Sequence, residues 1–206
     1  MQLQLGARQV SCLRGRRMLF EGVDVDLRAG QALRVAGPNG SGKSSLLRIL
    51  CGLALPHAGE VTWQGEGIGV QRAAYARKLL YLGHAPAIKE ELSAVENLAF
   101  DCALAEVDAD GAAVRKALAD AGVGKLADMA CRQLSEGQRK RVALARLHLA
   151  RERSLWVLDE PFSALDAAAT AALTGLMKAH LARGGLMVYT THQEAALAPH
   201  VTLVLG

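Results

Sequence analysis

Residues 37–44 of this sequence read GPNGSGKS, an octet whose residue types and spacing suit phosphate chemistry. Glycines let backbone N–H groups turn toward one anion, and a following helix N-terminus adds partial positive charge. Lys43 would contact the β- and γ-phosphates of a nucleotide, and the Ser44 hydroxyl would bind Mg²⁺. We therefore expect the whole octet to bind the nucleotide: Gly37, Pro38, Asn39, Gly40, Ser41, Gly42, Lys43 and Ser44.

Two carboxylates directly follow an apolar run farther along the chain, where Leu155–Leu158 leads into Asp159 and Glu160. A carboxylate at a strand end opposite a phosphate loop is placed to hold Mg²⁺, which suits Asp159. The next side chain along a strand points the other way, so Glu160 would orient and deprotonate the attacking water. An acidic turn after a strand is common by itself, and only the preceding octet favours the catalytic interpretation.

Two shorter features suit the same chemistry. The segment Leu134-Ser135-Glu136-Gly137-Gln138 places a hydroxyl and a glycine at the start of a basic helix, where free N–H groups bind anions. His192 follows an apolar strand and would hydrogen-bond a γ-phosphate. Taken alone, the first feature is equally a helix cap, and the second is more simply a structural histidine.

The elements that must position these residues can be predicted from periodicity and capping residues. A buried strand over Gln31–Ala36 precedes the octet, and a helix over about Lys43–Leu50 follows it. Ser93 and Asp110 are expected helix caps, and Ser135 with Gln138 has capping-box spacing. The other expected elements are strands at Glu60–Trp63, Leu79–Leu82, Leu155–Leu158 and Leu186–Thr190, and helices at Arg141–Leu149 and from Asp166 to Gly184-Gly185.

Composition and charge exclude several classes of protein. The 206 residues are 51% hydrophobic and 21% charged, which suits one α/β domain. A net charge of +4 is too small and dispersed to predict nucleic-acid binding. The four cysteines form no CxxC pair, which predicts reduced thiols in a cytosolic compartment. Neither a secretion leader nor an apolar run of about 18 residues is apparent, so we expect no membrane span.

Taken together and in this order, the motifs resemble those of the ATP-binding cassette (ABC) ATPases over essentially the whole chain. Gly37–Ser44 matches the family's Walker A loop, Leu134–Gln138 its LSGGQ signature, and Leu155–Glu160 its Walker B strand with the catalytic glutamate. Residues 163–166, Ser-Ala-Leu-Asp, resemble its D-loop, and His192 resembles its switch histidine. The resemblance implies an α/β P-loop NTPase fold with a mixed β-sheet core, a β-rich N-terminal part and an inserted helical subdomain.

The resemblance also implies one domain over residues 1–206, with a nucleotide-binding core at about 1–84 and 149–206 and a helical subdomain at 85–148. In this family two cassettes pack head to tail around ATP and Mg²⁺, so Ser135 and Gly137 would act on nucleotide held by a second copy. Closure on ATP and opening after hydrolysis drive attached hydrophobic membrane subunits. ATP and Mg²⁺ are the implied cofactors, and Asp166 would belong to the D-loop.

The sequence departs from the family's pattern in three places. Where most members carry an aromatic residue that stacks on adenine, the chain reads Cys12-Leu13-Arg14, which leaves the Arg14 guanidinium as a candidate. Glu136 replaces the third glycine of the signature, which the family tolerates. His84 stands where the Q-loop glutamine belongs. A neutral imidazole there would accept a hydrogen bond from metal-bound water, and a structural role is the alternative.

The loop GHAPAIK at 83–89, followed by ELSAVENL, narrows the resemblance to the ATP-binding subunit of the bacterial haem exporter of cytochrome c maturation. This resemblance implies an ATPase that energises haem export, or release of a haem-loaded chaperone, at the cytoplasmic face of the inner membrane. A hydrophobic membrane subunit would contact the loop 84–89 and the neighbouring helices within residues 85–148.

Three alternatives stay open. The first is an ABC ATPase for another cargo, such as an amino acid or a metal, although such chains usually carry the Q-loop glutamine and the adenine-stacking aromatic residue. The second is a soluble cassette of DNA repair or translation, but only 92 residues separate Lys43 from Ser135, and the chain holds one motif set. The third is a nucleotide-binding module without hydrolysis, which the presence of Glu160 and His192 argues against. The cargo itself cannot be predicted, because selectivity normally lies in the membrane subunits.

Overall fold

The structure is a computed structural model that describes residues 3–192 and 197–206. The chain divides into two compact units, each with its own hydrophobic core. The first, here called the sheet unit, comprises Met1–His84, Arg153–Pro161 and Lys178–Gly206. The second, the helical unit, comprises Ala85–Glu152 and Phe162–Met177.

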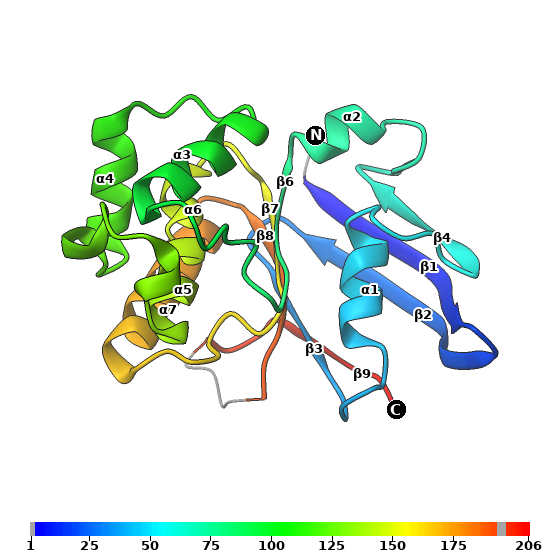
Figure 1. Cartoon of the computed structure of the whole chain (residues 1–206). Helices are drawn as coiled ribbons and strands as arrows, with labels where there is room; N and C mark the ends of the chain where they lie inside the picture. The colour runs from blue at the N-terminus through cyan, green and yellow to red at the C-terminus, as the bar shows by residue number, and fades with distance from the viewer. Residues whose placement is uncertain (1–2, 193–196) are drawn as a thin grey trace. The chain divides into compact units, whose positions relative to one another are not determined.

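A five-stranded sheet forms the centre of the sheet unit, in the order β6-β7-β8-β3-β9 (Figure 1). All its strand pairs are parallel. Uninterrupted apolar runs suit strands that are covered on both faces, and β7 and β8 are buried along their whole length. The strands are β3 (Ala32–Ala36), β6 (Leu79–Leu82), β7 (Leu155–Leu158), β8 (Leu186–Thr190) and β9 (Val201–Val204).

A second sheet of four antiparallel strands belongs to the same unit, in the order β2-β1-β4-β5. Its strands are β1 (Gln4–Arg14), β2 (Arg17–Arg28), β4 (Ala58–Trp63) and β5 (Glu66–Gly67). The parallel and antiparallel strands expected of a mixed core therefore lie in two separate sheets. Two helices accompany them, α1 (Lys43–Leu50) and α2 (Arg72–Ala76).

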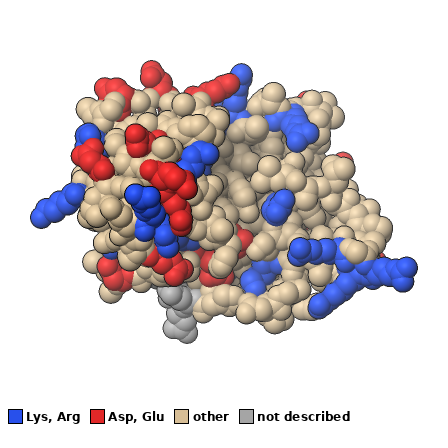
Figure 2. Space-filling view, in the orientation of Figure 1, with Lys and Arg blue, Asp and Glu red and all other residues tan. Residues whose placement is uncertain are grey.

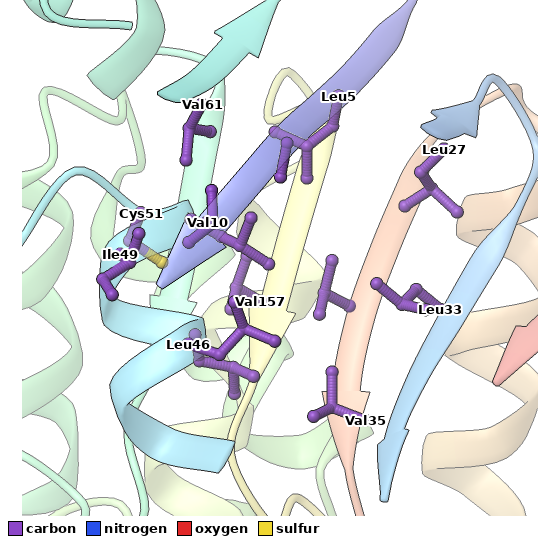
Figure 3. Packing of buried hydrophobic residues seen from close by; sticks show 14 of the residues in the cluster. Leu5, Val10, Leu27, Leu33, Val35, Leu46, Ile49, Cys51, Val61 and Val157 are labelled. Carbon is purple, nitrogen blue, oxygen red and sulfur yellow. The ribbon is translucent and has the colours of Figure 1, made fainter. Parts of the chain in front are cut away.

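The core of the sheet unit joins both sheets through α1 (Figure 3). Leu46 and Ile49 on the buried side of α1 share one cluster with Val157 of the parallel sheet and with Val10 and Val61 of the antiparallel sheet. Fully burying one such side chain contributes roughly 1.5–3 kcal/mol. The start of α1 is thereby fixed relative to both sheets.

The helical unit packs its helices around a separate cluster of Ala, Leu, Val and Cys side chains. On the face that Figure 2 presents, acidic and basic side chains lie interspersed over this unit. Two exposed ion pairs, Arg115–Asp128 at 2.7 Å and Lys116–Asp120 at 2.9 Å, belong to it. The helices are α3 (Ala94–Leu104), α4 (Gly111–Asp120), α5 (Glu136–Leu144) and α6 (Arg146–Leu149), with short 3₁₀ turns at Gly124–Leu126 and Cys131–Gln133.

The predicted elements agree closely with those observed. Strands β6, β7 and β8 and helix α1 have the predicted bounds, and Ser93, Asp110 and Ser135 cap α3, α4 and α5. One prediction needs correction, because the run expected as one helix from Arg141 is instead two, α5 from Glu136 and α6 up to Leu149. Among the described residues, no helix combines the length and apolar character needed to cross a membrane.

Helix α7 (Ala167–Ala182) begins in the helical unit and ends in the sheet unit. Residues 149–152 and 162–177 therefore belong to the helical unit by their contacts, and not to the sheet unit. The predicted division into a nucleotide-binding core at about 1–84 and 149–206 and a helical subdomain at 85–148 stays a prediction.

Candidate active site

The phosphate-binding loop, Gly37–Ser44, joins β3 to α1. Gly37 and Gly42 have φ values of 141° and 98°, which residues with a side chain rarely adopt. A Cβ atom at Gly37 would collide with the carbonyl oxygen of Leu205, and one at Gly42 would lie 2.8 Å from the ring of Phe20. The shape of the loop thus depends on glycine at both positions.

Several polar groups of this loop are arranged to receive an anion. No side chain from the described part of the chain caps α1 at Gly42, so the first N–H groups of the helix lack the usual capping oxygen. Lys43 Nζ donates to the carbonyl oxygens of Gly37 and Pro38 at 2.8 and 3.0 Å, within its own loop. Ser41 Oγ is buried and has no hydrogen-bond partner among the described residues. A phosphate group would accept hydrogen bonds from the uncapped helix N–H groups and from Lys43.

Asp159 and Glu160 directly follow β7, as predicted. Asp159 is only 3% exposed, and its backbone N–H donates to Leu82 O at 2.8 Å, which fixes it against the end of β6. Glu160 has a φ of 49°, in the left-handed region, which costs a non-glycine residue about 1–2 kcal/mol. Residues held in this way cluster at functional sites, because surrounding contacts must maintain them.

The end of β8 supplies those contacts. Thr190 Oγ1 donates to Asp159 Oδ1 at 2.7 Å and accepts from the backbone N–H of Glu160 at 2.8 Å. His192 N donates to Glu160 Oε2 at 3.3 Å, and His192 Nε2 lies 3.5 Å from Glu160 Oε1. The structure therefore brings Asp159, Glu160 and His192 together, and it adds Thr190.

Thr190 was not predicted from the sequence as a site residue. Its partners lie 31 and 30 residues earlier in the chain. A threonine at the end of an apolar strand is ordinary β-strand composition, so no local signal identifies it. Only the pairing of β7 with β8 brings the hydroxyl to the two acids.

The strand that carries these acids is anchored by a buried stack of two rings. Trp156 of β7 and His180 of α7 stack with centroids 4.0 Å apart and planes 10° apart. His180 Nε2 donates to Leu186 O at 3.1 Å, and a Cβ at Gly185 would collide with the imidazole. Burial lowers the pKa of His180 to about 4, so the ring is neutral at pH 7.

The signature segment, Leu134–Gln138, forms the N-terminus of α5 in the helical unit. Ser135 Oγ accepts from Gln138 N at 3.3 Å, and Gln138 Oε1 accepts from Ser135 N at 2.8 Å, which completes a capping box. Leu134 is buried, whereas Ser135 and Glu136 are exposed. The segment therefore presents its serine to the surface on a locally satisfied helix end.

Residues 163–166, predicted as the D-loop, lie against this same helix. A Cβ at Gly137 would collide with the carbonyl oxygen of Ala164, a residue whose own φ is 59°. Asp166 Oδ1 accepts from Ala169 N at 2.7 Å and so caps α7, while its Oδ2 lies 3.8 Å from an Arg141 guanidinium nitrogen. Gly137 thus has a packing role within one chain, beside any role toward a second copy.

Two further candidate positions are exposed. His84 lies just after β6, at the boundary of the sheet unit. Arg14 ends β1 and pairs in register with Arg17 across the β1–β2 hairpin. Their predicted roles toward the metal-bound water and the adenine stay predictions.

The donor set of the sheet unit fits Mg²⁺ and a nucleotide. Magnesium prefers hard oxygen ligands, one or two from the protein and the rest from phosphate and water. The Ser44 hydroxyl and the Asp159 carboxylate are such ligands. The uncapped start of α1 and the Lys43 ammonium group suit the phosphates of a nucleotide.

Comparison with known sequences identifies relatives over nearly the full chain. The family model described as ABC transporter matches residues 20–163. The chain is 52% identical over 200 residues to the cytochrome c biogenesis ATP-binding export protein CcmA of Aromatoleum aromaticum, covering 97% of this chain and 94% of that protein. It is 49% identical over 195 residues to the CcmA of Pseudomonas syringae pv. tomato, covering 95% and 91% respectively.

Comparison with solved structures gives the same fold. An ATP-binding cassette, solved as a dimer in a post-hydrolysis state bound to ADP and Pi, superposes with a TM-score of 0.83 at 24% identity, covering 98% of this chain and 94% of that one. The ATP-binding subunit of an ABC transporter superposes with a TM-score of 0.84, also at 24% identity, covering 98% and 85%. The α/β fold predicted from the motifs is confirmed.

Proposed function

The chain belongs to the ABC transporter family, and from that premise we propose which complex it serves. It is an ABC transporter ATPase, which binds and hydrolyses ATP. We propose that it energises haem export, or release of a haem-loaded chaperone, during bacterial cytochrome c maturation. The support is an identity of 52% and 49% to two CcmA proteins over at least 91% of each chain.

The observation that carries the ATPase part of the proposal is the sheet that the site residues share. β3 runs into the phosphate-binding loop, β7 runs into Asp159 and Glu160, and both strands are parallel neighbours of β8. Parallel strands present their carboxyl ends at one edge of a sheet. The loop, the two acids and His192 therefore follow strands that end at a common edge, which supports one site built from all of them.

The roles follow from the chemistry of each group. The phosphate-binding loop holds the nucleotide, with Lys43 at the β- and γ-phosphates. Ser44 and Asp159 would hold Mg²⁺, which when bound neutralises charge on the phosphate oxygens. Glu160 orients the attacking water and accepts its proton. His192, already bonded to Glu160 through its backbone, would donate to the γ-phosphate from its exposed ring.

A second copy completes the site in this proposal. The signature segment of one copy would face the nucleotide held by the other, in a head-to-tail dimer. The exposed position of Ser135 at the N-terminus of α5 supports such a role. A cassette of the same fold has been solved as a dimer bound to ADP and Pi, which supports pairing of two copies.

The membrane subunit would dock on the helical unit. Phe100 and Leu104, one turn apart on α3, are 42% and 70% exposed, and Lys89 Nζ lies 4.8 Å from the centroid of the Phe100 ring. The buried Asn97 holds the loop beside them, since its side chain accepts from Lys89 N and donates to Lys89 O. This apolar, preorganised surface supports a partner at the cytoplasmic face of the inner membrane, where the chain would lie peripherally.

A charge placed on this surface tests the docking. Leu104→Glu should abolish co-purification with the membrane subunit, because a carboxylate would be buried at the interface. Val70→Glu is the matched control, since Val70 is 88% exposed in the sheet unit. If both variants retained the membrane subunit equally, docking at this surface would be contradicted.

The proposed process is tested in the native host with Glu160→Gln. The variant should bind ATP but not hydrolyse it, so covalent haem in c-type cytochromes should be lost while apocytochrome persists on immunoblots. Glu152→Gln makes the same chemical change in an exposed turn and should leave haem staining normal. Normal staining in Glu160→Gln and in a strain without the membrane subunit would leave an ABC ATPase with another cargo.

A further inference from the structure

Building on the proposed function, we propose that Thr190 is a positioning residue for ATP hydrolysis. Its single hydroxyl holds the metal-binding carboxylate of Asp159 and the backbone of Glu160 at one point. The separation between the metal ligand and the water-orienting group is thereby fixed from β8.

The Thr190 hydroxyl acts as both donor and acceptor. Thr190 is 0% exposed, and its Oγ1 donates to Asp159 Oδ1 at 2.7 Å while it accepts from Glu160 N at 2.8 Å. A hydroxyl has one proton to donate, and here it is directed at the carboxylate. The two partners are consecutive residues, so one atom sets the orientation of the turn that follows β7.

Both partners need this support. Asp159 is 3% exposed, and a buried carboxylate without a donor is costly. Glu160 has a φ of 49°, and a strained residue stays in place only when its surroundings hold it. Without the Thr190 hydroxyl, the Glu160 N–H would lose this acceptor, and the turn would lose one of the contacts that oppose its relaxation.

The position of β8 makes this contact relevant to the nucleotide. Thr190 pairs in register with Val35 of β3, two residues before the phosphate-binding loop begins. Two residues after Thr190, His192 N donates to Glu160 Oε2. The end of β8 therefore lies between the strand that leads into the loop and the turn that carries both acids, so that Thr190 links the two.

Thr190→Val tests the proposal, because valine keeps the shape and removes the hydroxyl. In the complex purified with its membrane subunit, kcat should fall by on the order of 10- to 100-fold, the cost of misplacing a reacting group. The gain in ATP affinity that Mg²⁺ provides over EDTA should shrink by about 10-fold, since a hydrogen bond to a charged group is lost. Affinity in EDTA should stay within about twofold of wild type, because that binding needs no metal ligand.

Two variants separate positioning from general stability. Thr190→Ser keeps the hydroxyl, so its kcat and the gain in its ATP affinity from Mg²⁺ should both stay near those of wild type. Thr174→Val removes another buried hydroxyl, one that donates to Thr170 O within α7, and should change neither. The proposal is overturned if Thr190→Val keeps a normal kcat and Mg²⁺ effect, if it weakens binding equally in Mg²⁺ and EDTA, or if Thr190→Ser fails to restore both.

Glu160→Gln run in parallel distinguishes this proposal from the function on which it rests. If Glu160→Gln stops hydrolysis and haem attachment while Thr190→Val is normal, only the role of Thr190 fails. If the Glu160→Gln variant still hydrolyses ATP and supports normal cytochrome maturation, both the proposed function and the role of Thr190 fail.

Discussion

The N-termini of α1 and α5 are both predicted to face the phosphates of a nucleotide, yet they are built differently. Helix α1 follows a left-handed glycine, Gly42, and has no side-chain cap from the residues that the structure describes. Helix α5 follows Ser135, whose side chain forms a reciprocal capping box with Gln138. The first N–H groups of α1 are available to a ligand, whereas at α5 the Ser135 side chain already accepts a hydrogen bond from one N–H group of the helix start.

This difference indicates which helix end determines the affinity for a nucleotide. At α1, the Lys43 ammonium group adds positive charge to uncapped N–H groups, which favours an anion at this helix end. At α5, the cap makes a stable surface that is ready before any nucleotide arrives. We therefore expect affinity for ATP to depend on α1, and the α5 end to act only when two copies meet.

The largest effect expected from this comparison is that of Lys43→Ala. Removing the ammonium group should lower ATP affinity by about 100-fold or more, because two charge-assisted contacts to phosphate are lost. Titration with a fluorescent ATP analogue measures this change. If Ser135→Ala, assayed as a monomer, lost as much ATP affinity as Lys43→Ala, the two helix ends would not differ in their role.

A change of pH should affect β7 of the sheet unit but not the α5 cap, because His180 stacks on β7 whereas the capping pair Ser135 and Gln138 has no ionisable side chain. Burial lowers the pKa of His180 to about 4 from an ordinary value of 6.5. Because the pKa of His180 is lower in the folded protein than in the unfolded chain, its contribution to the free energy of unfolding is fully present above pH 6.5. That contribution is lost as the pH falls toward 4, and the loss is about 3 kcal/mol at most. Denaturant unfolding of wild type and His180→Phe should show the smaller decline over this window in the variant; equal declines would contradict the assignment.

Substitution of the close-packed glycine of α5 should have a smaller effect. Gly137→Ala places a methyl group against the Ala164 carbonyl and should cost roughly 1–3 kcal/mol of stability. Gly175→Ala is the matched control, because no described atom lies within 4 Å of its Cβ position on α7. That control should gain about 0.5–1 kcal/mol from helix propensity. Thermal unfolding that ranks the two variants alike would contradict the packing role of Gly137.

The smallest effect on stability concerns the cap itself. Ser135→Ala and Ser93→Ala each remove the serine of a capping box and should each cost about 1 kcal/mol. Only Ser135→Ala should also lower ATP hydrolysis by the complex, because only Ser135 belongs to the signature segment. A parallel loss of hydrolysis in Ser93→Ala would remove this distinction.

Local polar contacts were predictable from the sequence, and distant ones were not. The caps at Ser93, Asp110 and Ser135 join residues three apart, so their spacing reveals them. The hydrogen bond from Thr190 to Asp159 joins residues 31 apart and exists only because β7 and β8 pair. The Gly137–Ala164 approach is also long-range, so the sequence predicted a signature glycine but not its packing within the chain.

Complementation in trans shows most directly whether two copies share one nucleotide site. Two variants are prepared in a Glu160→Gln background, one with Lys43→Ala and one with Ser135→Arg, and each is assayed for stable trapping of labelled ATP. In a head-to-tail dimer, mixing them creates one site with an intact phosphate-binding loop from one copy and an intact signature segment from the other. We predict that neither variant traps ATP alone and that the mixture does; a mixture that traps no more than its components would contradict a site shared between two copies.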